Sequence, residues 1–324
     1  MTNDEPTGAI HVSGLTKSYC DHTVLDGLDL QVPAGRIFAL LGANGAGKTT
    51  TVRILSTLLP FDSGQVSVAG HPLPDGARAV RGRISVTGQY AAVDKVLTGR
   101  ENLMLVAELN HLGRGESRRR TAELLDRFDL VDAADRRVRD YSGGMARRLD
   151  LAMSLVAHPK VVFLDEPTTG LDPRSRREMW SVIRELAGDG VTIFLTTQYL
   201  EEADQLADRV AVIDGGRIVA EGTPDELKRL VDGGRMELQF ADRAQFDLAA
   251  GALPGAVTDD ATLTVEVSTD GSIASLKALL DRLDSPELAV ERFALHTPDL
   301  DDVFFALTGA PRVPGPTSTK AAAR

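Results

Sequence analysis

The chain has 324 residues, of which 43% are hydrophobic and 26% are charged, and its formal net charge is −11. This is the balance of a soluble globular protein, and the length is sufficient for two domains. An acidic surface argues against nucleic acid as the main partner, because binding to phosphates needs basic side chains. The basic run 118–120 lies in a helical pattern with Glu116 and Glu123, which predicts a solvated helix face.

No apolar run approaches the ~18 residues that are needed to cross a bilayer. The first ten residues, MTNDEPTGAI, lack the charged and apolar regions of a signal peptide. The single cysteine, Cys20, excludes an internal disulfide, and the six histidines show no metal-ligand spacing. We therefore expect a cytoplasmic protein that contacts a membrane only through a partner.

The first part of the chain, 1–230, alternates short apolar runs with helical patterns. Strands are expected at 36–41, 83–87, 161–164, 191–195 and 210–214. This alternation predicts an α/β fold with helices on both faces of a sheet. Helical patterns dominate the segment at about 99–158, which predicts a helical subdomain.

A second domain is expected after the composition shifts at 231–234. Its strands are predicted at 236–240, 256–258, 262–267 and 288–295, and its helices at 243–250, 272–283 and 300–307. The order βαββαβ predicts a small α+β domain of ferredoxin-like type over 235–309. The tail at 310–324 is rich in Pro, Ser and Thr and is predicted to be disordered.

The strongest chemical signal is GANGAGKTT, which fits the phosphate-loop pattern G-x-x-x-x-G-K-[ST] between a strand and a helix. Glycines let backbone N–H groups turn inward around phosphates, and the helix N-terminus adds partial positive charge. A chance glycine-rich turn is the competing interpretation. We expect Lys48 to contact the β- and γ-phosphates and Thr49 to coordinate Mg²⁺. The expected nucleotide-binding residues are Gly42, Ala43, Asn44, Gly45, Ala46, Gly47, Lys48, Thr49 and Thr50.

A second signal is VVFLDEP, in which an apolar strand delivers two carboxylates to its end. Asp165 is expected to hold Mg²⁺, directly or through water. Glu166 is expected to orient or deprotonate an attacking water. Taken alone, the motif also fits a strand that ends in an acidic turn.

A third signal is YSGGM, where Ser142, Gly143 and Gly144 open a strongly patterned helix. Ser142 is a favourable N-cap, and the two glycines expose backbone N–H groups. This is a second helix N-terminus suited to an anion. By itself the motif is weak, since most such starts are only caps.

Together these motifs resemble the nucleotide-binding subunit of an ABC transporter over the first ~230 residues. In that family, Gln89 in VTGQY would sense Mg²⁺ and water, Asp172 in TTGLDP would form the D-loop, and Tyr19 would stack on adenine. Without the resemblance, Tyr19 would be an ordinary half-buried strand residue. Met145 and Ala43 replace the usual glutamine and proline of two motifs, with little expected effect because backbone groups do the binding.

The glutamine at position 198 follows the strand predicted at 191–195. In most ABC ATPases a histidine here contacts the γ-phosphate, whereas glutamine is similar to the daunorubicin-type exporters. Its NH₂ can donate to a phosphate oxygen, but it cannot become a cation near neutral pH. We expect Gln198 to act as a neutral γ-phosphate sensor in catalysis; the alternative is a polar strand-end residue with a local hydrogen bond.

Three longer segments are similar to drug-export ATPases of the daunorubicin-resistance type, namely TGQYAAVDKVLTGRENL, TTQYLEEADQLADRVAVID and HTPDLDDVFFALTG. The resemblance implies ATP and Mg²⁺ as cofactors, and a head-to-tail homodimer in which 142–144 of one subunit contact ATP on the other. It further implies an ABC-2 type membrane permease as partner, no nucleic acid, and a peripheral location on the inner face of the cell membrane. A soluble non-transport ABC ATPase, an importer ATPase and the ATPase of a lipid exporter stay open as alternatives.

Overall fold

The computed structural model describes residues 8–89, 91–231, 234–253, 255–269, 272–283 and 289–308. The chain divides into two compact units, with the boundary between Pro224 and Asp225. Within the described ranges, no helix has the length and apolar character to span a bilayer. The tail at 310–324 lies outside these ranges, so its expected disorder stays a prediction.

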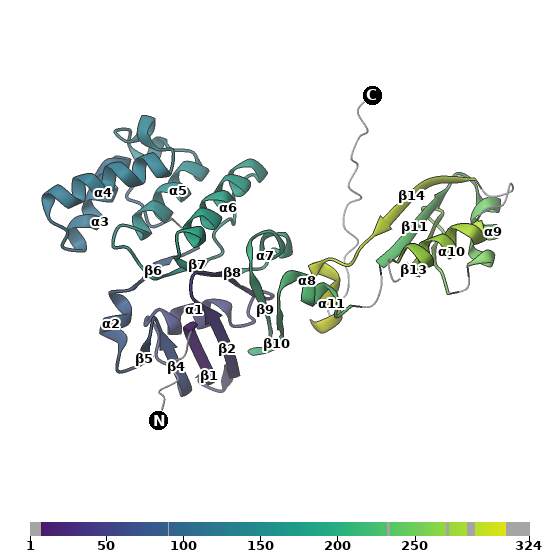
Figure 1. Cartoon of the computed structure of the whole chain (residues 1–324), viewed down its shortest axis with the longest axis horizontal. Coiled ribbons are helices and arrows are strands. Elements are labelled where there is room, and N and C mark those ends of the chain that lie inside the picture. The colour runs from purple at the N-terminus through teal and green to yellow at the C-terminus, as the bar shows by residue number, and fades with distance from the viewer. Residues whose placement is uncertain are drawn as a thin grey trace. The chain divides into compact units, whose positions relative to one another are not determined.

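The first unit is built around a six-stranded sheet with the order β10-β9-β3-β8-β7-β6 (Figure 1). Its strands are β3 (Ile37–Leu41), β6 (Ile84–Thr87), β7 (Val161–Asp165), β8 (Thr192–Thr197), β9 (Arg209–Asp214) and β10 (Arg217–Gly222). All neighbours are parallel except β10, which runs antiparallel to β9. The central strands β3 and β8 are buried along their whole length, because a parallel sheet is covered on both faces. The carboxyl ends of β3, β7 and β8 therefore meet at one edge.

A second, antiparallel sheet in this unit was not predicted from the sequence. Its order is β2-β1-β4-β5, with β1 (Gly8–Tyr19), β2 (His22–Pro33), β4 (Ser63–Val68) and β5 (His71–Leu73). Polar residues interrupt these strands because one face is solvated, so they lack the continuous apolar runs of a buried strand. Helix α1 (Lys48–Leu55) contributes Val52, Ile54 and Leu55 to a core cluster that also contains residues of both sheets.

Helices cover the rest of the first unit. They are α2 (Ala77–Arg81), α3 (Gly99–Leu109), α4 (Arg114–Arg127), α5 (Gly143–Ser154), α6 (Pro173–Gly188) and α7 (Leu200–Leu206). A further short helix, α8 (Pro224–Lys228), begins at the boundary and belongs to the second unit apart from its first residue. Helices α3, α4 and α5 gather on one side of the unit (Figure 1).

The prediction of a solvated helix face at 118–120 is wrong for Arg120, which is only 6% exposed. Its guanidinium donates to Glu123 and to the Leu155 carbonyl, because α4 turns this side chain toward α5.

The second unit has the order expected for a ferredoxin-like fold. Its elements are β11 (Gly234–Phe240), α9 (Arg243–Ala252), β12 (Val257–Asp259), β13 (Thr264–Thr269), α10 (Ile273–Leu283), β14 (Val290–His296) and a final α11 (Leu300–Thr308). The strands form an antiparallel sheet of order β12-β13-β11-β14, which is the ferredoxin-like arrangement. Met236, Leu238 and Phe240 alternate on β11 and pack against Phe246 of α9 in the core of this unit.

Candidate active site

The loop between β3 and α1 has a shape that depends on glycine. Gly45 and Gly47 have φ angles of 84° and 111°, in the left-handed region that other residues avoid. A Cβ atom on Gly47 would lie 2.7 Å from Leu25 Cδ2, so no larger side chain fits there without movement. The two glycines therefore allow a tight turn that connects β3 to the N-terminus of α1. The free N–H groups at that N-terminus favour binding of an anion.

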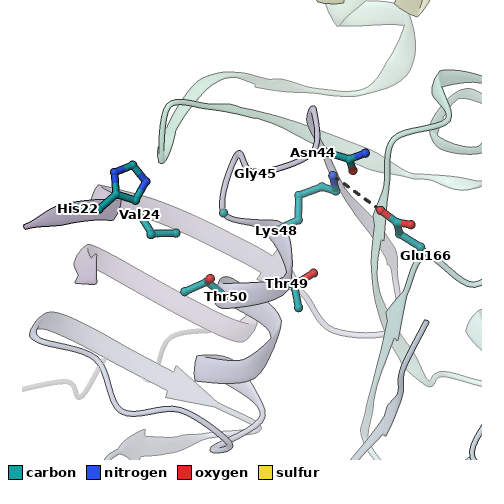
Figure 2. Close-up of a pocket in the computed structure, with 9 residues that line it drawn as sticks. His22, Val24, Asn44, Gly45, Lys48, Thr49, Thr50 and Glu166 are labelled. Carbon is teal, nitrogen blue, oxygen red and sulfur yellow. Dashed lines mark ion pairs between the residues drawn. The ribbon is translucent and has the colours of Figure 1, made fainter. Parts of the chain in front are cut away.

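A pocket of about 350 Å³ opens beside this loop (Figure 2). Its size lies in the range of small-molecule sites. Its lining residues are His22, Val24, Asn44, Gly45, Gly47, Lys48, Thr49, Thr50 and Glu166. The pocket thus brings the glycine-rich loop together with the second carboxylate of β7.

His22 and Val24 in this lining were not predicted from the sequence. They stand two residues apart on β2, so their side chains lie on the same side of the strand. The available signal was their position directly after the hairpin turn that follows Tyr19. Tyr19 itself is 44% exposed and is not among the lining residues, and Lys17 Nζ lies 5.7 Å from the centroid of its ring. Stacking of Tyr19 on adenine stays a prediction.

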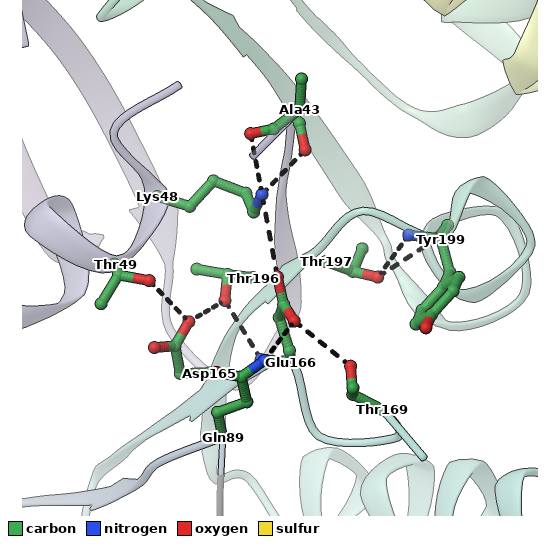
Figure 3. A network of polar contacts seen from close by, with 11 residues as sticks. Ala43, Lys48, Thr49, Gln89, Asp165, Glu166, Thr169, Thr196, Thr197 and Tyr199 are labelled. Carbon is green, nitrogen blue, oxygen red and sulfur yellow. Dashed lines mark hydrogen bonds and ion pairs between the residues drawn. The ribbon is translucent and has the colours of Figure 1, made fainter. Parts of the chain in front are cut away.

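Lys48 is buried in the wall of the pocket, with its amine turned back toward the loop (Figure 3). Nζ donates to the carbonyls of Gly42 and Ala43 at 2.8 and 3.1 Å, and lies 3.9 Å from Glu166 Oε1. Burial lowers the pKa of Lys48, and the charges of Glu166 and Asp165 oppose that shift. The amine is therefore fixed between the loop and the acidic end of β7.

The carboxylate of Asp165 faces the start of α1. Thr49 Oγ1 donates to Asp165 Oδ1 at 3.4 Å, and Thr196 Oγ1 donates to the same oxygen at 2.5 Å. Thr196 was missed from the sequence, although it pairs with Asp165 in the register of β7 and β8. Two hydroxyls and a carboxylate thus converge where the strands end.

Glu166 has a strained backbone that is held in place by several contacts. Its φ angle is 48°, in a region that costs a residue with a Cβ about 1–2 kcal/mol. Its backbone N–H donates to the Thr196 carbonyl at 3.1 Å. Gln89 Nε2 and Thr169 Oγ1 both donate to Oε2 at 3.2 Å, which leaves Oε1 on the side of Lys48 (Figure 3). Strain that neighbours maintain in this way is characteristic of functional positions.

Gln198 lies directly after β8, beside the start of the glycine-rich loop. The preceding residue, Thr197, accepts a hydrogen bond through its carbonyl from the Gly42 N–H at 3.3 Å. The Gln198 side chain is half-buried. It is also not among the pocket-lining residues, so its expected contact with a phosphate stays a prediction.

The second helix start is formed as expected but lies outside the pocket lining. Ser142 is the N-cap of α5, and its Oγ accepts from the Met145 N–H at 3.2 Å. A Cβ atom on Gly144 would lie 2.7 Å from Ser175 Oγ, so this glycine allows α5 to approach α6 closely. Gly143 has open space around it.

Asp172 begins α6 as its N-cap. Its carboxylate accepts from the backbone N–H groups of Arg174 and Ser175, both at 3.0 Å, and from Ser175 Oγ at 2.6 Å. The hydrogen bond from the Ser175 hydroxyl is the main reason that the pKa of Asp172 is lowered. Asp172 is therefore an ionised residue at a fixed position, and it does not line the pocket.

Behind the site, one buried carboxylate links the segments that follow Glu166 and Gln198. Glu202 on α7 accepts at Oε1 from Thr168 Oγ1 at 2.7 Å and from Trp180 Nε1 at 3.1 Å. Burial raises the pKa of Glu202, and these hydrogen bonds act against the shift. Glu202 thus joins the segment that follows Glu166 to helix α7, which follows Gln198.

Comparisons with known proteins find relatives in sequence and in fold. A family described as ABC transporter matches residues 25–169. The daunorubicin resistance ATP-binding protein DrrA3 of Streptomyces coeruleorubidus is 50% identical over 306 residues, covering 94% of this chain and 97% of that protein. The Nod factor export ATP-binding protein I of Burkholderia orbicola is 39% identical over 304 residues, with 93% and 97% covered. The structure of cbiO1 from Clostridium perfringens, described as part of the ABC transporter complex cbiONQ, has a TM-score of 0.65 at 28% identity and covers 68% of this chain and 90% of its own.

Proposed function

The chain belongs to the ABC transporter family, among the ATP-binding subunits of the daunorubicin-resistance type, and from that premise we propose that its ATPase activity powers export of hydrophobic drugs or natural products. Anthracycline-like antibiotics are the proposed cargo, because a relative that matches nearly the whole chain is described as a daunorubicin-resistance protein. The observation that carries the ATPase role is the pocket in which Lys48 and Glu166 face each other beside the glycine-rich loop.

We propose that the phosphates of ATP bind along residues 42–50, with Lys48 at the β- and γ-phosphates. The oxygen donors Thr49, Asp165 and Gln89 fit a Mg²⁺ ion, which prefers hard oxygen ligands, and the first two already lie within 3.4 Å of each other. When bound, Mg²⁺ would neutralise charge on the β- and γ-phosphate oxygens. The buried Lys48 amine would add a positive charge to the same site.

Glu166 is the proposed general base. Gln89 and Thr169 occupy one carboxylate oxygen, and the other oxygen faces the pocket, where it can accept a proton from the attacking water. Because the backbone of Glu166 is held by Thr196, its carboxylate stays in place as the proton moves. Gln89 would orient the same water from the side of β6.

The active form is proposed to be a head-to-tail homodimer. The helix start at 142–144 carries the features of an anion site, yet it does not line the pocket of its own chain. In the dimer, Ser142, Gly143 and Gly144 of one subunit would contact the γ-phosphate bound to its partner. Asp172 would lie at the boundary between subunits. ATP would thereby hold the two chains together, and its hydrolysis would release them.

The proposed membrane partner is a separate ABC-2 type permease, which fits the family and the description of cbiO1 as part of a larger complex. The protein would lie on the inner face of the cell membrane and contact it only through that partner.

We further propose that residues 1–230 are the ATP-binding domain, with a helical subdomain at 99–158, and that residues 235–309 are a separate small domain. The net charge of −11 gives no support to a nucleic-acid partner.

Replacement of Gln198 by alanine is expected to lower kcat for ATP hydrolysis by a factor of roughly 10², because a donor to the transferring phosphate is lost. The measurement is steady-state ATPase activity, together with the dissociation constant for ATP. Gln198→His is the matched control, since histidine supplies a donor at the same position and should keep most of the activity. Hydrolysis unchanged in Gln198→Ala would remove this residue from the mechanism.

Cellular retention of an anthracycline tests the transport function. The chain is co-expressed with the membrane protein encoded beside it, and the wild type is compared with Glu166→Gln. Lower retention only with the wild type would support ATP-driven drug export. Equal retention would contradict an anthracycline cargo, and the search would move to other natural products, as the similarity to a Nod factor export protein suggests.

A further inference from the structure

A buried arginine stands behind the proposed catalytic pair without lining the pocket. Arg147, in the second turn of α5, is only 6% exposed. Its Nε donates to the Pro167 carbonyl at 2.8 Å, and its Nη1 donates to the Gly88 carbonyl at 2.7 Å. Nη1 also lies 3.1 Å from Asp150 Oδ2. One guanidinium therefore ties three separate chain segments together.

The two carbonyls belong to neighbours of the proposed catalytic residues. Gly88 directly precedes Gln89, and Pro167 directly follows Glu166. The Gln89 amide is in turn bonded to the Glu166 carboxylate at 3.2 Å. Because a guanidinium is planar and rigid, it fixes the distance between the two carbonyls that it bonds. Arg147 thus sets the separation of the backbones from which Gln89 and Glu166 extend.

Asp150 extends the connection to the segment beyond Gln89. Its Oδ1 accepts from the backbone N–H of Ala92 at 2.9 Å, while its other oxygen holds Arg147. The arginine and the aspartate lie on the same helix, one turn apart, and that helix begins at the Ser142 cap. A displacement of α5 would therefore move Gly88 and Ala92, which lie on either side of Gln89 in the sequence.

Stability alone does not account for this pair. Burial lowers the pKa of Arg147 and raises that of Asp150, so both charged forms are held against a desolvation cost. Arg147 Nη2 is buried and has no hydrogen-bond partner among the described residues. Buried ion pairs are often replaced by apolar residues without loss of stability. A role in positioning explains the arrangement better.

We propose that Arg147, held by Asp150, is a positioning residue for ATP hydrolysis that fixes Gln89 against Glu166 and links both to α5. The inference rests on the proposed roles of Gln89 and Glu166. In the dimer, contact of the Ser142 end of α5 with ATP on the other subunit would be transmitted along this helix to the catalytic pair of its own subunit.

The first test is Arg147→Lys, with Arg120→Lys as the matched control. Lysine keeps a cation for Asp150 but has no planar fork to bond both carbonyls. Arg120 is equally buried, pairs with Glu123 three residues later in its helix, and donates to the carbonyl of Leu155 at the end of α5. Among the described residues, its hydrogen-bond and ion-pair partners do not include a residue of the site. We expect kcat to fall at least about tenfold in Arg147→Lys, since small misplacements cost up to about 10²-fold. The dissociation constant for ATP should stay within about twofold, and Arg120→Lys should keep its kcat.

A double variant, Arg147→Met with Asp150→Leu, keeps the test decisive if the single variant fails to fold. It removes both buried charges together, so neither is left unpaired, but the carbonyls of Gly88 and Pro167 and the N–H of Ala92 lose these partners. Its thermal midpoint is therefore measured first, and kcat, read well below that midpoint, should stay low. Wild-type kcat in the double variant, or an equal loss in Arg120→Lys, would overturn the proposal. Glu166→Gln distinguishes failure of the positioning role from failure of the proposed catalytic roles. If Glu166→Gln still hydrolyses ATP, the proposed catalytic pair itself is wrong. If Glu166→Gln is inactive and the double variant is active, only the positioning role of Arg147 is wrong.

Discussion

Glu166→Gln is expected to lower kcat for ATP hydrolysis by a factor of about 10²–10⁴, the usual contribution of a general base. The amide has the shape of the carboxylate, and its oxygen can still accept from Gln89 and Thr169, so ATP should bind as before. Because ATP then persists between the subunits, the variant should form an ATP-stable dimer. The measurements are ATPase activity and gel filtration with ATP and Mg²⁺.

A matched control for this variant is Glu178→Gln, which removes an exposed carboxylate of α6 that pairs with Arg174 on the surface. It should hydrolyse ATP like the wild type and show no added dimer. A Glu166→Gln protein that elutes as a monomer with ATP and Mg²⁺ would contradict the dimer mechanism. Wild-type kcat in that protein would contradict the assignment of the base.

Lys48→Ala is expected to weaken ATP binding by roughly 10–10²-fold, since a charge-assisted hydrogen bond contributes about 1.5–3 kcal/mol. The change also releases the carbonyls of Gly42 and Ala43, which the amine holds at the mouth of the loop. Both effects lower affinity, the first through lost attraction and the second through a less ordered loop. The dissociation constant for ATP is the measurement.

Lys160→Ala serves as the control, because this lysine is exposed on the same unit and lies away from the pocket. It should keep the affinity of the wild type. The thermal midpoint of Lys48→Ala should also be recorded, so that a folding defect is not mistaken for lost binding. A dissociation constant like that of the wild type would remove Lys48 from phosphate binding.

The convergence of Lys48, Asp165 and Glu166 could be predicted from the sequence, because each follows an apolar run of strand length. Parallel strands place such residues at one edge of the sheet, and β3 and β7 each pair with β8 in that arrangement. The ferredoxin-like order of the second unit was equally readable, since its strands and helices are short, patterned and separated by turns. The local sequence pattern was sufficient to predict an element where that element buries a continuous or an alternating set of apolar residues.

Features that depend on neighbours distant in the sequence were not predictable. Arg120 and Arg147 both lie in helices with nearby acidic residues, which is the pattern of a solvated surface, yet other segments cover them. His22 lines the pocket only because the β1–β2 hairpin approaches the glycine-rich loop. The antiparallel sheet was missed because half-buried strands of mixed polarity give a weak local signal.

The hydrogen bonds that Thr168 and Trp180 donate to Glu202 suggest a way to follow ATP turnover in solution. Trp180 is the only tryptophan of the chain, and its buried indole shares its carboxylate partner with the segment that follows Glu166. Tryptophan emission from unlabelled protein therefore comes from one position, which is linked through Glu202 to the segment that follows Glu166. We expect a movement of that segment or of α7 during a turnover to alter the surroundings of the indole, and stopped-flow fluorescence would follow such a movement without an attached dye.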